Sequence, residues 1–241
     1  MKTPRILATS GGLVPGPTQM SARVGTMLTD ALASTRKARP RVCLVYTASG
    51  DAATYYAMSY EAFNAAGCDV TELKLFPQPS DRADERLLGA DLVWVGGGSV
   101  ANLLALWRLH GIDELMRAAW QSGVILAGVS AGSLCWHAGG TTDSFGPTLA
   151  PVTNGLALLP YANGVHYDSE AQRRPLLHQL VAEATFERAY ASDDGVGIWY
   201  EGTQATRVVG DGATSASGAY LVERVGGSVV ETRVGVGESF A

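Results

Sequence analysis

The chain has 241 residues, of which 46% are hydrophobic and 17% are charged, and its formal net charge is -5 at pH 7. This composition is typical of a globular protein with a sizeable core and excludes an intrinsically disordered chain. The mild acidity offers no basic surface for nucleic acid, and nowhere do about 18 apolar residues run unbroken, so we expect neither nucleic acid nor a membrane as a partner. We expect a single domain over residues 1–241.

Five short runs early in the chain have the continuous apolar character of buried strands: residues 6–9, 41–47, 69–76, 90–95 and 124–127. Between them, four segments with apolar residues at three- and four-residue spacing predict helices: residues 22–34, 54–66, 101–109 and 113–121. This alternation predicts an α/β fold with a mostly parallel sheet covered by helices on both faces.

From Tyr190 onward the chain changes to short β-branched runs broken by glycine, at residues 196–200, 205–209, 219–224 and 228–234. Asp211-Gly212 and Gly226-Gly227 have the composition of hairpin turns. These runs predict an antiparallel extension of the sheet at its C-terminal end.

The three cysteines, Cys43, Cys68 and Cys135, are an odd number at irregular spacing and contain no CxxC pair. We therefore expect reduced core residues and no metal site built on cysteine. The first residues lead directly into an apolar, strand-like run without the long apolar stretch of a secretory signal, which favours a cytoplasmic protein.

A serine lies at the centre of Gly128-Val129-Ser130-Ala131-Gly132. The pentapeptide alone is a weak signal, because a glycine-rich chain can contain GxSxG by chance. Here a predicted strand precedes it and a predicted helix over residues 131–137 follows, which is the context of a nucleophile elbow. We predict that Ser130 is the nucleophile of a hydrolase, against the alternative of a tight turn that happens to contain serine.

A second glycine-rich segment, Gly96-Gly97-Gly98-Ser99, follows the strand predicted to end at residue 95. Glycines leave backbone N–H groups unobstructed, so Gly97 and Gly98 can stabilise an oxyanion together with the N–H of Ala131. The alternatives are a phosphate-binding loop and a flexible turn. No Lys-Ser/Thr pair follows and no GxGxxG is completed, which disfavours nucleotide binding.

A serine nucleophile needs an adjacent base, usually a histidine held by a carboxylate. Of the four histidines, His110 closes a predicted helix, His178 lies among leucines, and His137 lies two turns beyond the elbow on the predicted helix. His166 ends a short apolar stretch in a predicted loop, where a catalytic base is expected. We predict His166 as the base, against the alternative of a hydrogen-bonded loop histidine.

Three carboxylates are candidates to orient that histidine. Asp143 lies in a Gly/Thr-rich loop after the elbow, and Asp168 and Glu170 lie close to His166 in the sequence. Next-but-one residues share a face of an extended segment, so Asp168 can orient His166 only if the chain bends suitably. Asp143 is favoured, but spacing alone leaves all three open.

Four motifs occur in order: GGGS at 96–99, GVSAGSLCWH at 128–137, TTDSFGP at 141–147 and GVHYDSEAQRR at 164–174. Together they resemble the peptidase E and cyanophycinase family of serine peptidases, whose fold is similar to that of class I glutamine amidotransferases. The resemblance covers most of the chain, up to Asp193-Asp194-Gly195.

This resemblance implies an exopeptidase that, in the best-known branch, acts on dipeptides beginning with aspartate. It implies Ser130 as nucleophile, His166 as base, Asp143 as the third member, and an oxyanion hole formed by Gly97, Gly98 and Ala131. It also implies a short peptide as substrate and a homo-oligomer, a dimer or higher.

Two positions depart from the family's pattern. Ser99 stands where the glycine loop commonly ends in asparagine, and Glu170 aligns with the arginine that binds the substrate's aspartate in the aspartyl-dipeptidase branch. A carboxylate at that position repels an aspartate. We therefore expect no strict aspartate specificity unless Arg173 or Arg174 supplies the charge from a shifted register; a broader dipeptidase or carboxypeptidase-like activity fits as well.

Two alternatives come from other classes. An α/β-hydrolase esterase shares GxSxG, but its histidine normally follows the last strands, and here none follows His178 although several strands remain. The non-enzymatic alternative is a binding protein that has the same fold and no turnover. The chemistry predicted for a hydrolase is acyl transfer through a serine, which needs neither a metal nor an organic cofactor.

Overall fold

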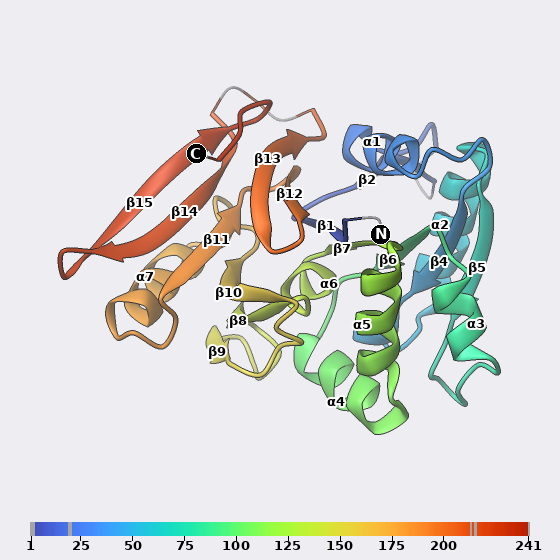
Figure 1. Cartoon of the computed structure of the whole chain (residues 1–241), viewed down its shortest axis with the longest axis horizontal. Coiled ribbons are helices and arrows are strands. Elements are labelled where there is room, and N and C mark those ends of the chain that lie inside the picture. The colour runs from blue at the N-terminus through green and yellow to red at the C-terminus, as the bar shows by residue number, and fades with distance from the viewer. Residues whose placement is uncertain (1–2, 19–20, 213, 215, 241) are drawn as a thin grey trace.

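The computed structural model describes residues 3–18, 21–212, 214 and 216–240. Within these residues the strands form a seven-stranded sheet, a six-stranded sheet and the two-stranded pair β2 (Leu13–Pro15) and β3 (Ala22–Val24). The two large sheets lie side by side (Figure 1).

The seven-stranded sheet is mostly parallel. Its strands lie in the spatial order β13 (Gln204–Gly210), β12 (Val196–Glu201), β1 (Arg5–Thr9), β7 (Ile125–Val129), β6 (Leu92–Val95), β4 (Arg41–Val45) and β5 (Asp69–Leu73). The strands from β1 to β5 pair in parallel, and β12 and β13 join the edge in antiparallel pairing. The α/β fold predicted from the sequence is confirmed.

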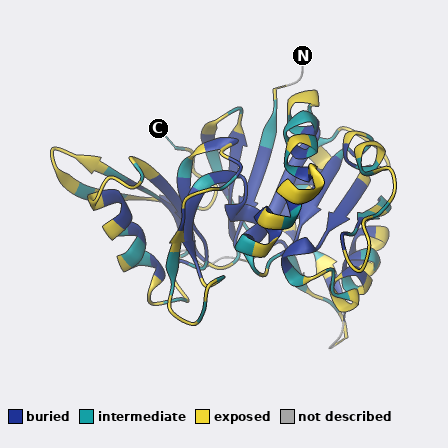
Figure 2. Ribbon diagram, turned by 90° about the horizontal axis from the view of Figure 1, so that it is seen from below, coloured by how far each residue is buried: buried dark blue, intermediate teal, exposed yellow. Residues whose placement is uncertain are grey.

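Helices cover both faces of this sheet, because alternate strand residues point to opposite sides. Leu7 belongs to the hydrophobic cluster under α1 (Thr26–Ser34) and α2 (Ala53–Ala65). Ile6 and Ala8 belong to the cluster on the other face. That face is covered by α3 (Ala83–Leu88), α4 (Val100–His110), α5 (Ile112–Ser122) and α6 (Ala131–Leu134). Figure 2 shows the buried strands between helices whose outer surfaces are exposed.

The six-stranded sheet is mixed. Its spatial order is β15 (Ser228–Gly235), β14 (Gly218–Val225), β11 (Arg188–Ser192), β10 (Leu159–Gly164), β8 (His137–Thr142) and β9 (Ala150–Val152). The central strands β8, β10 and β11 are parallel, and the others pair antiparallel. Helix α7 (Arg173–Ala182) packs on one face through a small apolar cluster that includes Leu177 and Val181.

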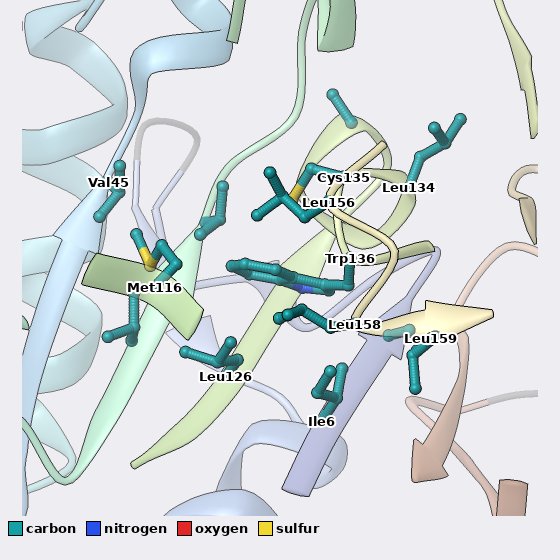
Figure 3. Close-up of a cluster of buried hydrophobic side chains, with 14 of the residues drawn as sticks. Ile6, Val45, Met116, Leu126, Leu134, Cys135, Trp136, Leu156, Leu158 and Leu159 are labelled. Carbon is teal, nitrogen blue, oxygen red and sulfur yellow. The ribbon is translucent and has the colours of Figure 1, made fainter. Parts of the chain in front are cut away.

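A hydrophobic cluster joins the two sheets beneath α6. It combines residues of the first sheet, such as Leu126, with residues of the second, such as Leu159. The fully buried indole of Trp136 lies among these side chains (Figure 3). Replacing such an indole by alanine costs about 3–5 kcal/mol. This shared core holds the turn before α6 at the junction of the sheets.

Some local predictions differ from the structure. Residues 22–24 form β3 instead of the start of a helix, because they pair with β2. The helix predicted over residues 131–137 ends at Leu134, and His137 begins β8, where it pairs with Leu159 of β10. Tertiary pairing therefore overrides the local pattern in both places.

The C-terminal strands extend both sheets. The predicted hairpin at Gly226-Gly227 is confirmed, because Val225 pairs with Ser228 across it. The hairpin predicted at Asp211-Gly212 is wrong, because β13 pairs with β12 in one sheet and β14 pairs with β11 in the other.

The cysteines lie in the core as predicted: Cys43, Cys68 and Cys135 are free and buried. In the part of the chain that the structure describes, no helix has the length and apolarity to cross a membrane.

Candidate active site

Ser130 lies on the sharp turn between β7 and α6. Its backbone has φ 57° and ψ -115°, a strained conformation for a residue other than glycine. The flanking chain packs so closely that side chains do not fit: a Cβ on Gly128 would lie 2.2 Å from the Gly132 oxygen, and one on Gly132 would lie 2.2 Å from the Val95 oxygen. The predicted nucleophile elbow is therefore present, with Ser130 half-buried at its tip.

The glycine loop after β6 lies against this serine. A Cβ built on Gly97 would be 3.2 Å from the Cβ of Ser130 and 3.7 Å from its Oγ. Among the described residues, no protein group accepts a hydrogen bond from the N–H of Gly97, Gly98 or Ala131. The loop and the start of α6 thus bring the three predicted oxyanion donors to the serine.

His166 follows β10 and is paired with a carboxylate. Its Nδ1 lies 2.5 Å from Oδ1 of Asp194, in the loop between β11 and β12. An Nδ1–H that donates to Asp194 leaves Nε2 with a lone pair, which is the tautomer of a general base. The backbone N–H of Asp194 donates in turn to the Asp168 carboxylate at 2.8 Å, which fixes the loop.

The charge on Asp194 is favoured by its partners. Burial raises the pKa of this carboxyl, but hydrogen bonds from His166 and Ser169 outweigh burial, so its pKa is lowered from the ordinary value. Asp194 therefore stays ionised near neutral pH, as an orienting carboxylate must.

The serine and the histidine are anchored to consecutive residues at the end of β1. The backbone N–H of Ser130 donates to the Thr9 oxygen at 3.0 Å, and that of His166 donates to the Ser10 hydroxyl at 3.1 Å. Between these two described side chains there is no hydrogen bond. In ligand-free enzymes the contact between nucleophile and base often closes only in the substrate complex.

Asp143, the predicted third member, lies elsewhere. It is exposed just after β8 and, with Glu170, lines a separate cavity of about 490 Å³. Within the described chain, the carboxylate bonded to His166 is that of Asp194. The Asp143 loop is drawn toward α4, since the hydroxyl of Ser144 accepts a hydrogen bond from the Ala101 N–H at 3.4 Å. The predicted pairing of Asp143 with His166 is thus absent from the structure.

The two carboxylates next to His166 in the sequence have other partners. Asp168 holds the backbone of Asp194, and Glu170 accepts from the Nε of Arg173 at 2.8 Å. Spacing did not reveal Asp194, which is separated from His166 by the whole of α7 and β11. The available signal was the Asp193-Asp194-Gly195 segment just before a predicted strand.

The predicted substrate-binding residues are largely engaged in local structure. The Ser99 hydroxyl caps α4 by accepting from the Asn102 N–H at 3.2 Å. Arg173 is 3% exposed and donates inward to the Thr141 oxygen. Arg174 lies over the Tyr167 and Tyr220 rings and pairs with Glu231. A cavity of about 390 Å³ opens beside Ser130, and neither Arg173 nor Arg174 is among the residues that line it.

The remaining histidines have structural surroundings. His110 is the last residue of α4. His137 is fully buried, its Nδ1 lies 3.0 Å from the Ser133 oxygen, and burial lowers its pKa to about 4. Nε2 of His178, on α7, lies 2.8 Å from Oε2 of Glu231, on β15. In the described chain, no group of three or more His, Cys, Asp or Glu side chains is placed to hold a metal ion.

The chain is similar in sequence to known peptidases. Residues 6–208 match the model of Peptidase family S51. The uncharacterized peptidase YgaJ of Bacillus subtilis (strain 168) is 38% identical over 188 residues, which cover 78% of this chain and 79% of that protein. Peptidase E of Shewanella denitrificans is 26% identical over 166 residues, or 65% of this chain and 68% of that protein.

The solved structure of a peptidase from an acI-B1 Actinobacterium has the same fold: it matches with a TM-score of 0.70 and 15% identity, over 99% of this chain and 97% of that one. The resemblance to peptidase E noted in the sequence is confirmed, and the α/β-hydrolase alternative is excluded by the family match. The chain belongs to peptidase family S51, the family that includes peptidase E, and is a serine-type peptidase.

Proposed function

We propose that this peptidase is an exopeptidase that hydrolyses dipeptides or short peptides through an acyl-enzyme on Ser130. The observation that carries the proposal is the arrangement around this strained serine. Three backbone N–H groups without protein acceptors in the described chain belong to the adjoining glycine loop and to the start of α6, and the backbones of Ser130 and His166 bond to the consecutive residues Thr9 and Ser10.

In the proposed reaction, the Ser130 hydroxyl attacks the peptide carbonyl while Nε2 of His166 takes its proton. The imidazolium formed is stabilised by Asp194, and the developing oxyanion by the N–H groups of Gly97, Gly98 and Ala131. His166 then returns the proton to the leaving amine. A water molecule, activated by the same histidine, hydrolyses the acyl-enzyme.

The same arrangement supports a specificity broader than aspartate. An aspartate side chain is bound tightly where a guanidinium clamps it. Arg173 is buried against Glu170 and Thr141, and Arg174 is held by two tyrosine rings and Glu231. We therefore extend the proposal to a dipeptidase or carboxypeptidase-like enzyme without strict aspartate preference.

Labelling with a fluorophosphonate probe tests the nucleophile. We expect one adduct, located on Ser130 by mass spectrometry and lost in Ser130→Ala. Digestion of a short-peptide library, read by mass spectrometry, then distinguishes release of amino-terminal dipeptides from trimming at the carboxyl end. An adduct on another residue, or cleavage confined to the interior of long chains, contradicts the proposal.

A further inference from the structure

A cavity of about 390 Å³ opens directly beside Ser130. Part of its wall is formed by Gly97, Gly98 and Ser130. A substrate whose carbonyl oxygen is bound by the oxyanion donors therefore has a side chain next to this cavity. Six larger side chains, all apolar or aromatic, complete most of the wall: Leu13, Tyr46, Tyr55, Met58, Trp94 and Val129.

The polar atoms of Tyr46 and Trp94 have partners within the protein. The hydroxyl of Tyr46 lies 2.5 Å from the Ser59 hydroxyl and accepts from the Trp94 indole N–H at 3.3 Å. Tyr46 and Trp94 are 4% and 1% exposed, whereas Tyr55 is 51% exposed and stacks on Tyr46 with ring centroids 5.6 Å apart. The cavity therefore has a fixed aromatic floor and a more open mouth formed by Tyr55.

None of the described residues that line the cavity carries a charge. The nearest carboxylate along the chain from Ser49 is that of Asp51, which accepts from the Leu75 and Phe76 N–H groups at 2.6 and 2.9 Å and from the Tyr56 hydroxyl. A charged substrate side chain would lose its water there and gain no partner, whereas an apolar one would exchange water for ring contacts.

The position of the cavity also decides which substrate residue enters it. The leaving amine must face His166, since this residue protonates it. The cavity shares Ser130 and the glycine loop with the site, but it contains neither His166 nor Asp194. It therefore lies on the side of the acyl residue, whose carbonyl is attacked.

We infer that this cavity binds the side chain of the acyl residue and selects a large apolar one, aromatic or branched aliphatic. The inference rests on the proposed acyl-enzyme at Ser130 and adds the substrate class.

Aminoboronic acids test this directly, because boron takes the place of the attacked carbonyl carbon and the side chain takes the acyl position. Analogues of phenylalanine, alanine and aspartate are compared by the concentration that halves fluorophosphonate labelling of Ser130. We expect the phenylalanine analogue to act at a concentration at least tenfold lower than the alanine analogue, and the aspartate analogue to be the weakest. Equal potency, or preference for the aspartate analogue, overturns the inference.

Two substitutions on α2 place the effect in the cavity. Met58→Arg puts a positive charge in the wall, and we expect it to weaken the phenylalanine analogue at least tenfold and strengthen the aspartate analogue. Asn64→Arg adds the same charge to the exposed side of the same helix and should change neither. If Met58→Arg behaves like Asn64→Arg, the cavity does not hold the acyl side chain.

Tyr55→Ala provides a second variant at an exposed position, where folding is least at risk. It should weaken the phenylalanine analogue several-fold and leave the alanine analogue unchanged; equal effects on both contradict the inference. Failure of Ser130 to label at all contradicts the proposed function and this inference together. Normal labelling without the apolar preference contradicts this inference alone.

Discussion

The two large sheets contribute different parts of the candidate active site. The seven-stranded sheet provides Ser130, the glycine loop and the apolar cavity, all at the carboxyl ends of parallel strands, where ligands bind in open α/β sheets. The six-stranded sheet provides His166 after β10 and, after β11, Asp194. The first part is built from contacts between short glycine-rich motifs, and the second from parallel pairing of distant strands. The elbow of the proposed nucleophile is thus formed mainly by short motifs, whereas the position of the proposed base depends on how the second sheet docks.

Removing the nucleophile is the largest expected effect on the first sheet. Ser130→Ala should lower kcat for peptide hydrolysis by about 10⁴–10⁶-fold and abolish fluorophosphonate labelling, because the proposed acyl-enzyme forms on this hydroxyl. Circular dichroism should be unchanged. Ser122→Ala, at the exposed end of α5, is the control and should keep full activity. Substantial turnover in Ser130→Ala would contradict the account.

Removing the base tests the second sheet. His166→Ala should lower kcat by about 10³–10⁵-fold, since the serine then has no proton acceptor. His178→Ala removes the histidine of α7, which packs on the same sheet. Its partner is Glu231, and the variant should retain activity within about threefold. Steady-state kinetics on one short peptide compares them. Similar losses of kcat in both variants would mean that His166 supports the structure and does not act as the base.

Acidification should weaken the junction between the sheets. His137 begins β8, and its Nε2 lies 3.4 Å from the Tyr200 hydroxyl on β12 of the other sheet. Its folded pKa is about 4, below the ordinary value near 6.5, so between these pH values the unfolded chain binds a proton that the folded chain does not. The free energy of unfolding therefore falls as the pH is lowered through this window, by about 3 kcal/mol in all for His137.

Urea unfolding at pH 7 and pH 4.5 measures this loss. His137→Gln has no titratable group at this position and should therefore lose less stability between the two pH values than the parent chain. His178→Gln is the control, because it replaces a partly exposed histidine. It should lose as much stability between pH 7 and pH 4.5 as the parent chain. An identical pH dependence in His137→Gln and the parent would show that His137 does not resist protonation in the folded protein.

The smallest expected effect concerns the contact between the sheets at Ser10. Its hydroxyl accepts the His166 N–H and lies 2.8 Å from the Ser192 hydroxyl. Ser10→Ala leaves a half-buried N–H without its acceptor, which costs about 1–3 kcal/mol. We expect kcat to fall about tenfold while KM changes little, with recovery in Ser10→Thr, which keeps the hydroxyl. An equal loss in both variants would point to packing instead.

The difference between the sheets also explains what could be predicted from the sequence. The strand, turn and helix around Ser130 lie within one short segment, so the elbow was predicted correctly, although Gly132 is required by the Val95 oxygen of another strand. In the second sheet, β14 and β15 have eight residues each and were predicted, as the runs 219–224 and 228–234. The other four strands, β8 to β11, have three to six residues each, and β8 contains two glycines, so periodicity did not reveal them. For the same reason His137 was predicted on a helix although it begins a strand.

The carboxylate that contacts His166 shows most clearly what could not be predicted from the sequence. Loops after β8 and after β11 both lie beside β10, since both strands pair with it in parallel. The motifs of the sequence favoured Asp143, in the first of these loops. The bond from Ala101 to Ser144 draws that loop toward α4, and the His166 ring bonds to Asp194 in the second loop. No pattern within a short window contains this information.

The most direct test of the account compares Asp194→Asn with Asp143→Asn. Both substitutions remove one charge and keep the side-chain size, and the second-order rate constant for fluorophosphonate labelling of Ser130 measures activation of the nucleophile. We predict that Asp194→Asn lowers this constant by about 10²–10⁴-fold, because an asparagine no longer holds the His166 tautomer, and that Asp143→Asn stays within about threefold of the parent. A large loss in Asp143→Asn with little change in Asp194→Asn would contradict the central claim that the second sheet supplies the His166–Asp194 pair.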